Sequence, residues 1–441
     1  MAHVFKRIDG SVTAPRGFRA AGVFCDIKRL GTGKGSNKGR KRDLALIVSD
    51  VPAVAAGMFT TNQVCAAPVK LCAGRMKRGT SRAIVVNSGN ANACTGRQGR
   101  HDAESMARLT ASALGIDSLD VLVASTGRIG VALPMANVGQ GIQSAGAFIE
   151  PGRVAAAHVA EAIMTSDTRA KEVAVEFDLG GRTVRIGGVC KGAGMIQPGM
   201  SATGARPAAA PLHATMLCFI TTDASIGKRA LQTALRHSVA QSFNRITVDG
   251  DMSTNDTVLV LANGLSGGAR LATRSTPLPV FQAALDFVTL ELAKMIVRDG
   301  EGVSRFVTVR VRGARNFADA DAAARAVANS ALVKTSWHGG DPNWGRIIDA
   351  LGYSAATVVE DKVDIGYSEP GSRRVIFSLQ RGQPTTATFK QLCAAVAPRE
   401  FDLHIDLHLG HAGAVMYAAD LTEDYVDFNK GDVTDPASLG G

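Results

Sequence analysis

Two stretches of this sequence decide its interpretation: Cys190–Pro198 (CKGAGMIQP) and His213–Asp223 (HATMLCFITTD). The first is rich in glycine and predicts a turn. The second opens with Ala214-Thr215 and continues as a short apolar run bounded by polar residues, which predicts a buried strand from Thr215 to Ile220. A β-branched residue at the start of a strand is an ordinary structural feature, so the rest of the chain must show whether Thr215 does chemistry.

Two further segments read as insertions. Ser201–His213 is rich in Ala, Gly and Pro with little periodicity, which predicts an exposed loop or linker directly before Thr215. Gly31–Arg40 is rich in glycine and basic residues but contains no aromatic residue. We interpret it as a solvated loop rather than a nucleic-acid-binding arm. Gly31–Gly35 lacks the glycine spacing of a dinucleotide-binding loop.

A strand–helix–strand unit lies upstream. Ala83–Val86 and Val121–Val123 are short apolar runs that predict buried strands, and Asp102–Leu114 has helical spacing, followed by a candidate C-cap at Gly115. The second strand opens into Ser125–Gly127, a run of turn-forming residues.

Other elements follow from periodicity. Glu172–Ile186 alternates around Gly180-Gly181 and predicts a hairpin. Amphipathic or Ala-rich spacing predicts helices over Arg229–Phe243, Val280–Val297 and Ala318–Val327.

Composition limits the class of protein. A chain of 441 residues is too long for one compact core, so two or three domains are expected. The net charge is +10, and hydrophobic residues make up 46% of the chain. The seven cysteines include no Cys-x-x-Cys pair, and no apolar run reaches the length of a membrane helix. We therefore expect a cytoplasmic protein with free thiols and no membrane or nucleic-acid partner.

The histidines do not predict a metal site. His404 and His408 lie in an alternating segment, and on one strand they would be about 13 Å apart, too far for a single ion. We expect no metal ion.

The stretch around Thr215 resembles the self-cleaving signature of the ornithine acetyltransferase family, also called glutamate N-acetyltransferases of arginine biosynthesis. The family pattern is Lys-Gly-(Ser/Ala)-Gly-Met-Ile-x-Pro-Asn-Met-Ala-Thr-Met-Leu. The resemblance covers nearly the whole chain, and its other matches are Thr13–Phe18, Asn87–Gly96, Thr247–Asp251, Ser253–Asp256, Arg298–Gly302, Asp341–Arg346 and Asp424–Val426.

The resemblance implies an α/β/β/α sandwich of the self-cleaving N-terminal-nucleophile type, with a second, smaller α/β domain from about residue 305. Cleavage between Ala214 and Thr215 would give an alpha chain, 1–214, and a beta chain, 215–441. Thr215 would then be the nucleophile, activated by its own α-amine, and Thr126 and Gly127 would stabilise the oxyanion.

The resemblance also implies a substrate site. Its contacts are Thr165, Lys191, Thr215, Glu301, Asn429 and Thr434. N-acetylornithine would donate the acetyl group to glutamate without a cofactor, and use of acetyl-CoA as a donor stays open. The two fragments would stay together and pair into an α2β2 heterotetramer.

This sequence departs from the family pattern around the site. Ser201–His213 has no counterpart, Arg128 replaces a small or apolar residue, and Ala202-Thr203 offers a second Ala-Thr pair. We choose Thr215 because a buried strand follows it. A self-cleaving aminopeptidase or amidohydrolase, an uncleaved binding protein, and a paralogue recruited to a specialised pathway are the alternatives.

Overall fold

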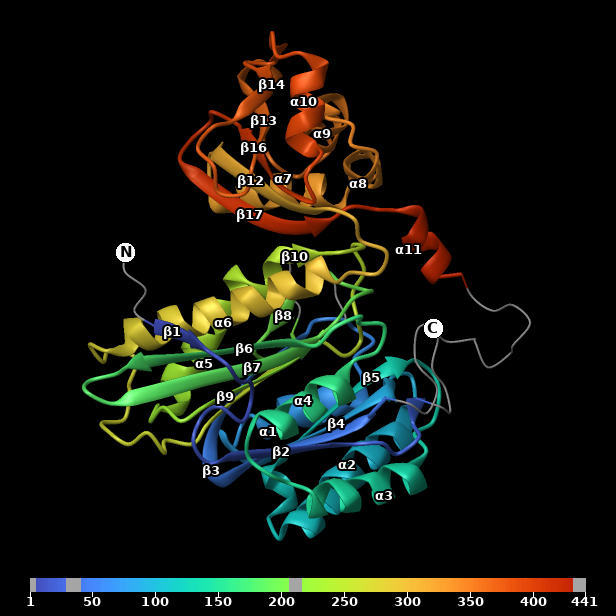
Figure 1. Cartoon of the computed structure of the whole chain (residues 1–441), viewed down its shortest axis with the longest axis vertical. Coiled ribbons are helices and arrows are strands. Elements are labelled where there is room, and N and C mark those ends of the chain that lie inside the picture. The colour runs from blue at the N-terminus through green and yellow to red at the C-terminus, as the bar shows by residue number, and fades with distance from the viewer. Residues whose placement is uncertain (1–4, 29–40, 206–215, 431–441) are drawn as a thin grey trace. The chain divides into compact units, whose positions relative to one another are not determined.

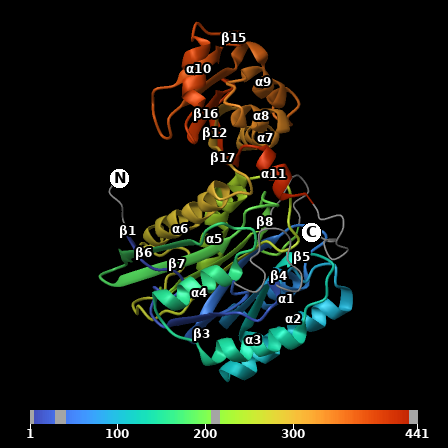
Figure 2. The ribbon, with the colours of Figure 1, turned by 45° about the vertical axis from the view of Figure 1, so that its right-hand side comes forward.

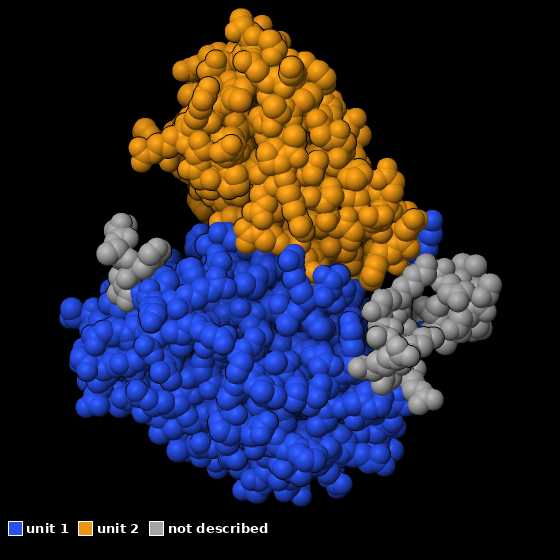
Figure 3. Space-filling model, viewed as in Figure 1, with its two compact units in different colours: residues 1–244, 251–296, 430–441 blue, residues 245–250, 297–429 orange. Residues whose placement is uncertain are grey.

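The computed structural model describes residues 5–28, 41–205 and 216–430. The chain divides into two compact units, coloured separately in Figure 3. Unit 1 comprises Met1–Asn244, Asp251–Ile296 and Lys430–Gly441, and unit 2 comprises Arg245–Gly250 and Val297–Asn429.

A single hydrogen-bonded sheet forms the centre of unit 1. Its main path runs β1-β6-β7-β9-β11-β3-β4-β5, with β2 and β8 also paired to β3. The strands are β1 (Phe5–Ile8), β2 (Phe18–Val23), β3 (Leu44–Thr60), β4 (Thr80–Asn90), β5 (Val121–Arg128), β6 (Lys171–Asp178), β7 (Thr183–Lys191), β8 (Met200–Ser201), β9 (Leu217–Thr222) and β11 (Thr257–Ala262).

Strand β3 divides this sheet into two halves. Its first part pairs with β2 and β4, its last part pairs with β11, and the β3–β4 register shifts between Val48 and Ala53. One half-sheet therefore holds β2, β4 and β5, the other holds β1, β6, β7, β9 and β11, and β3 belongs to both.

The two half-sheets share a buried core. Ile47, Val86 and Leu122 from one half belong to the same apolar cluster as Phe219 and Leu259 from the other. This packing removes from water the β-branched and aromatic side chains that the strands carry.

Helices cover the outer faces of both half-sheets (Figures 1 and 2). The half-sheet with β4 and β5 packs on α2 (Gly96–Leu114) and α3 (Met135–Ala147). The other half-sheet packs on α5 (Lys228–Gln241) and α6 (Leu278–Arg298). Two further helices, α1 (Ala67–Arg75) and α4 (Arg153–Ile163), add side chains to the core between the half-sheets. The layers are helix, sheet, sheet, helix, so the predicted α/β/β/α sandwich is confirmed.

Unit 2 is a smaller two-layer α/β structure. Its sheet has the order β10-β17-β12-β16-β13-β14-β15. The strands are β10 (Ile246–Thr247), β12 (Phe306–Ala314), β13 (Asp364–Ser368), β14 (Ile376–Gln380), β15 (Gln383–Pro384), β16 (Glu400–Asp406) and β17 (Ala412–Ala419). The helices are α7 (Phe317–Asn329), α8 (Ala331–His338), α9 (Trp344–Gly352), α10 (Phe389–Val396) and α11 (Glu423–Phe428).

Alternation along β16 explains the layers of unit 2. Phe401, Leu403 and Ile405 enter one apolar core together with side chains of α7 to α10, whereas the side chains between them are polar. The second, smaller α/β unit agrees with the expectation.

Several boundaries differ from the sequence predictions. Helix α2 begins at Gly96 rather than near Asp102 and ends at Gly115, whose φ of 64° suits glycine. The predicted turn at Ser125–Gly127 is the last part of β5, because pairing with β4 continues to Arg128. The hairpin turns at Gly180-Gly181 as predicted. Gly31–Arg40 and most of Ser201–His213 lie outside the described residues.

Candidate active site

The predicted oxyanion residues lie where two parallel strands end. Thr126 in β5 pairs with Ser88 in β4, and its side chain is buried. Gly127 has a φ of 132°, and a Cβ atom there would lie 2.3 Å from the Gly89 carbonyl carbon and 2.4 Å from the Asn90 nitrogen. Both the backbone conformation and the close approach therefore require glycine.

Buried side chains fix this end of β5. Asn255 Nδ2 donates to the carbonyl oxygens of Ala91 and Ser125, at 2.7 Å each. Ser125 Oγ donates to Asn87 Oδ1 at 2.6 Å. The backbone that carries Thr126 and Gly127 is thus held from both sides, as a preorganised oxyanion site requires.

The strand that follows the predicted nucleophile is central in the sheet. Strand β9 lies between β7 and β11, and all its residues are buried. The Met216 amide donates to Asp256 Oδ1 at 2.6 Å, so the chain is fixed one residue after position 215. Ala214 and Thr215 themselves lie outside the described residues.

One buried carboxylate, Asp167, binds the backbone at Thr165 and just after Lys191. Asp167 accepts hydrogen bonds from the Thr165 amide at 3.0 Å and the Gly192 amide at 2.7 Å, and Lys171 Nζ lies 2.5 Å from it. Lys191 ends β7 opposite Leu217, the first residue of β9, and only 2% of it is exposed. Asp167 therefore links two places in the backbone where the resemblance puts substrate contacts, and their contact with substrate stays a prediction.

Charge balance sets the state of Asp167. Burial alone would raise the pKa of its carboxyl, but Lys171, Lys191 and the Gly192 amide outweigh burial and hold the pKa well below its usual range. Asp167 is therefore ionised at neutral pH, and the cations beside it have a permanent counter-ion.

Two of the other predicted contacts, Glu301 and Asn429, belong to unit 2. Asn429 directly follows α11, and its Nδ2 donates to Glu301 Oε2 at 3.1 Å. Glu301 and Asn429 therefore form a pair, as the resemblance suggested by placing both in one site. Thr434 lies outside the described residues.

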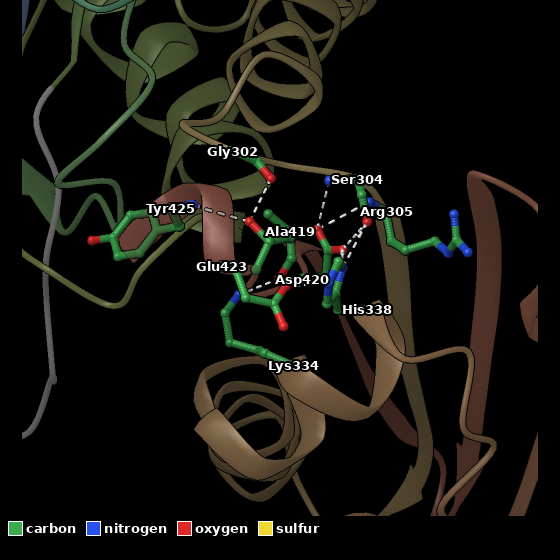
Figure 4. A network of polar contacts seen from close by, with 10 residues as sticks. Gly302, Ser304, Arg305, Lys334, His338, Ala419, Asp420, Glu423 and Tyr425 are labelled. Carbon is green, nitrogen blue, oxygen red and sulfur yellow. Dashed lines mark hydrogen bonds and ion pairs between the residues drawn. The ribbon is translucent and has the colours of Figure 1, made fainter. Parts of the chain in front are cut away.

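Polar contacts hold α11 to the rest of unit 2 (Figure 4). The helix contains no buried residue. Thr422 Oγ1 accepts from the Tyr425 amide and donates to the Gly302 carbonyl at 2.7 Å, and His338 Nε2 lies 2.7 Å from Glu423 Oε2. A backbone hydrogen bond of Glu423 and the contact with His338 lower the pKa of this exposed carboxyl.

Sequence reasoning missed Asp167, Asn255 and Asp256 as parts of the site. Asn255 and Asp256 lie in Ser253–Asp256, one of the segments that match the family, but the resemblance gave neither residue a role. The available signal was a run of four polar residues immediately before an apolar strand, since polar groups carried into a core need dedicated partners.

The histidines have separate partners. His404 Nε2 contacts Ser368 Oγ at 2.9 Å, and His408, which follows β16 rather than lying in it, contacts Asp364 at 2.7 Å. Within residues 5–28, 41–205 and 216–430, no group of three or more His, Cys, Asp or Glu side chains could hold a metal ion.

Among the helices in the described part of the chain, none combines the length and the apolar character that crossing a bilayer demands.

An α/β/β/α sandwich with a central buried strand that begins at Leu217, two residues after Thr215, is typical of the class of N-terminal-nucleophile enzymes. Comparison with known families identifies the family within this class. Residues 19–432 match the ArgJ family, and the chain belongs to it. The family resemblance is therefore confirmed, and with it the expectation of an acyltransferase.

Similar proteins extend along nearly the whole chain. The arginine biosynthesis bifunctional protein ArgJ of Symbiobacterium thermophilum is 48% identical over 95% of this chain and 98% of its own length. The glutamate N-acetyltransferase of Methanocaldococcus jannaschii is 44% identical over 96% of this chain and 98% of its own. Among solved structures, ornithine acetyltransferase of Mycobacterium tuberculosis, complexed with ornithine, is 38% identical over 45% of this chain and all of its own, with a TM-score of 0.40.

Proposed function

We propose that this protein cleaves itself between Ala214 and Thr215 and then transfers an acetyl group from N-acetylornithine to glutamate through an acetyl ester on Thr215. The observation that carries the proposal is the fixed Thr126-Gly127 turn in a chain of the ArgJ family. The acetyl groups handled by related proteins pass through tetrahedral intermediates, which need such a turn.

Cleavage needs only groups of the chain and water. Thr215 Oγ attacks the Ala214 carbonyl carbon, and the bond from that carbon to the Thr215 nitrogen breaks as the nitrogen takes the hydroxyl proton. Water then hydrolyses the resulting ester, which leaves a carboxylate on Ala214 and both an amine and a hydroxyl on Thr215. Such an amine is an established activator of a threonine nucleophile.

Transfer follows in two balanced steps. The Thr215 amine takes the hydroxyl proton as Oγ attacks the acetyl carbon, and the proton passes to the departing ornithine amine. The glutamate amine then attacks the ester, and Oγ leaves with a proton. An α-amine titrates near pH 8, which suits this exchange at neutral pH.

Charge assigns the substrate contacts. Glu301 would bind an amine of ornithine, and buried Lys191 would bind a carboxylate, with Thr165, Asn429 and Thr434 as polar contacts. M. tuberculosis ornithine acetyltransferase has been solved with ornithine, which supports an amino acid of this kind as ligand. Acetyl-CoA as a second donor, the α2β2 assembly and a cytoplasmic location remain predictions.

N-terminal sequencing of the fragment that carries the new N-terminus, the larger of the two, tests the proposal. It should read Thr-Met-Leu-Cys-Phe, and Thr215→Ala should give one uncleaved chain without acetyl transfer. Thr203→Ala is the matched control, because it alters the other Ala-Thr pair and should cleave normally. A read of Thr-Gly-Ala-Arg, or transfer by the Thr215→Ala variant, would contradict the assignment, and release of free acetate without glutamate acetylation would favour a hydrolase.

A further inference from the structure

His338 links three parts of unit 2 through polar contacts (Figure 4). It is the last residue of α8. Its Nδ1 lies 3.2 Å from Oγ of Ser304, shortly before β12, and its Nε2 lies 2.7 Å from Oε2 of Glu423 in α11. Ser304 Oγ also donates to Oδ2 of Asp420, which directly follows β17. One chain of contacts therefore runs from the sheet of unit 2 through His338 to α11.

Asp420 acts in this chain as an acceptor. It is buried, and its Oδ1 accepts the amides of Ser304 and Arg305 at 3.0 and 2.9 Å, while Oδ2 accepts the Ser304 hydroxyl. Arg305 supplies only its amide, and its side chain extends away from His338 (Figure 4). The group therefore lacks the order of a Ser-His-Asp catalytic triad, in which the serine hydroxyl donates to the histidine. It is suited to holding structure rather than to nucleophilic attack.

The contacts of His338 need more hydrogens than its neutral ring can supply. Three contacts each need one hydrogen: Ser304 to Asp420, His338 to Ser304, and His338 to Glu423. The hydroxyl supplies the first, and a neutral imidazole supplies only one of the other two. Either neutral tautomer thus leaves a ring nitrogen facing another acceptor. An imidazolium supplies both hydrogens and places its charge 3.6 Å from Asp420 Oδ2 and 2.7 Å from Glu423 Oε2.

The position of α11 depends on polar contacts, because none of its residues is buried. His338 contacts Glu423, the first residue of the helix, and Asn429 directly follows the last. Asn429 Nδ2 donates to Glu301 Oε2 at 3.1 Å. A change in the attachment of α11 therefore reaches the pair of Glu301 and Asn429.

We propose that His338 in its charged form is a positioning residue that holds α11, and with it Asn429, beside Glu301. The inference rests on the proposed function, in which Glu301 and Asn429 bind ornithine. Loss of the proton removes one of the three contacts, so α11 is held less firmly and the pair is placed less well for substrate. Histidine changes its charge between about pH 5 and 8. Because the proton stabilises the attached form, ornithine binding is strongest at the low end of this range and weakens as the pH rises.

Two titratable neighbours of His338 have shifted pKa values that keep them apart from it. Burial lowers the pKa of Lys334, one turn earlier in α8, to about 8, with Asp249 and Asp420 opposing the shift. A backbone hydrogen bond and the contact with His338 lower the pKa of Glu423. Measurements from about pH 5.5 to 7 therefore separate the histidine from both neighbours.

Ornithine binding by the cleaved protein, measured by calorimetry over this pH range, tests the proposal, because ornithine without an acetyl group cannot be turned over. Kd should rise about threefold or more from the low to the high end in the wild type. His338→Gln keeps a donor for Glu423 but cannot gain a proton. Its Kd should be raised about threefold at the low end and stay within about 1.5-fold across the range, with kcat within about twofold of the wild type.

Glu423→Gln is a second variant that leaves His338 in place. Its amide can donate to the neutral imidazole, so the third hydrogen no longer has to come from the ring. The pH dependence of Kd should therefore disappear in this variant as well. A persisting pH dependence contradicts the proposal, and this result decides the matter if His338→Gln does not fold.

His408→Gln is the matched control. His408 also lies in unit 2 beside two carboxylates, 2.7 Å from Asp364 Oδ2 and 3.6 Å from Asp406 Oδ1, but it follows β16. It should keep the Kd and the pH dependence of the wild type. A wild-type Kd that does not change with pH, or a pH dependence that persists in His338→Gln, overturns the inference.

Glu301→Gln separates failure of the inference from failure of the proposed function. Weaker ornithine binding in Glu301→Gln, together with a pH dependence that persists in His338→Gln, overturns the inference alone. Unchanged ornithine binding in Glu301→Gln contradicts the proposed substrate contact, and the inference with it.

Discussion

The oxyanion turn of unit 1 and helix α11 of unit 2 hold predicted site residues in opposite ways. Thr126 and Gly127 are fixed by buried strands and amide side chains, and α11 before Asn429 is attached by exposed polar contacts. Groups that must meet a transition state need a fixed position. Groups that only bind a substrate tolerate a looser one. We therefore predict that changes at Thr126 alter kcat more than KM, and that changes at α11 alter KM more than kcat.

The largest effect is expected at the buried charge cluster of unit 1. Asp167→Asn leaves Lys171 and Lys191 without their carboxylate, which should cost about 3–5 kcal/mol in the free energy of unfolding. Urea unfolding measures it.

The pH dependence of that difference has a defined sign. A carboxyl with a depressed folded pKa contributes stability that is present above its unfolded value of about 3.9 and is lost as the pH falls toward the folded value. The difference in the free energy of unfolding between wild type and Asp167→Asn should therefore become smaller below about pH 4. A gap that stays constant to pH 2.5 would contradict the charge argument.

The next effect concerns Thr126. Thr126→Val keeps the shape of the buried side chain but removes the hydroxyl, and loss of one oxyanion donor lowers kcat by about 10²–10³-fold. Steady-state transfer assays measure it, with unfolding as the check on folding. Thr385→Val is the control, because it removes a hydroxyl in unit 2 that donates to the Phe377 carbonyl, and it should retain kcat. A loss of less than about threefold at Thr126 would remove it from the oxyanion site.

The smallest effect should come from α11. Glu423→Gln weakens the exposed contact with His338, so KM for the amino-acid substrate should rise about two- to fivefold with little change in kcat. The rise should diminish in high salt, which already screens the pair in the wild type. Glu360→Gln alters another exposed carboxylate of unit 2 and serves as control. A drop in kcat without a change in KM would break the proposed division between chemistry and recognition.

Much of the fold could be predicted because periodicity marks buried elements directly. The hairpin at Gly180-Gly181, helices α5 and α6, and the strand after Thr215 all follow from apolar spacing. The first turn of α2 could not be found this way, because Gly96–Arg100 is almost entirely polar and is helical through its continuity with the amphipathic part.

The site was predictable only in part. The resemblance named Lys191 and Thr165 as substrate contacts, which stays a prediction, but it did not name Asp167, the buried carboxylate that binds the backbone beside them. Hydrogen bonds such as Asn255 to Ala91 join positions 164 residues apart, and no local pattern encodes them. How far β5 pairs with β4 depends likewise on the close approach of Gly127 to Gly89, which exists only in three dimensions.

The strand order of unit 1 bears on how the enzyme could be built from two genes. Strands β9 and β11, from the predicted second fragment, lie between β7 and β3 from the first, with six residue pairs on each side. The half-sheet of β1, β6, β7, β9 and β11 therefore contains strands from both fragments, so neither polypeptide alone can complete it. Separately refolded 1–214 and 215–441 should stay aggregation-prone and regain activity slowly or not at all. Co-expression of the same two pieces should succeed, and a purification tag on either one should then recover both.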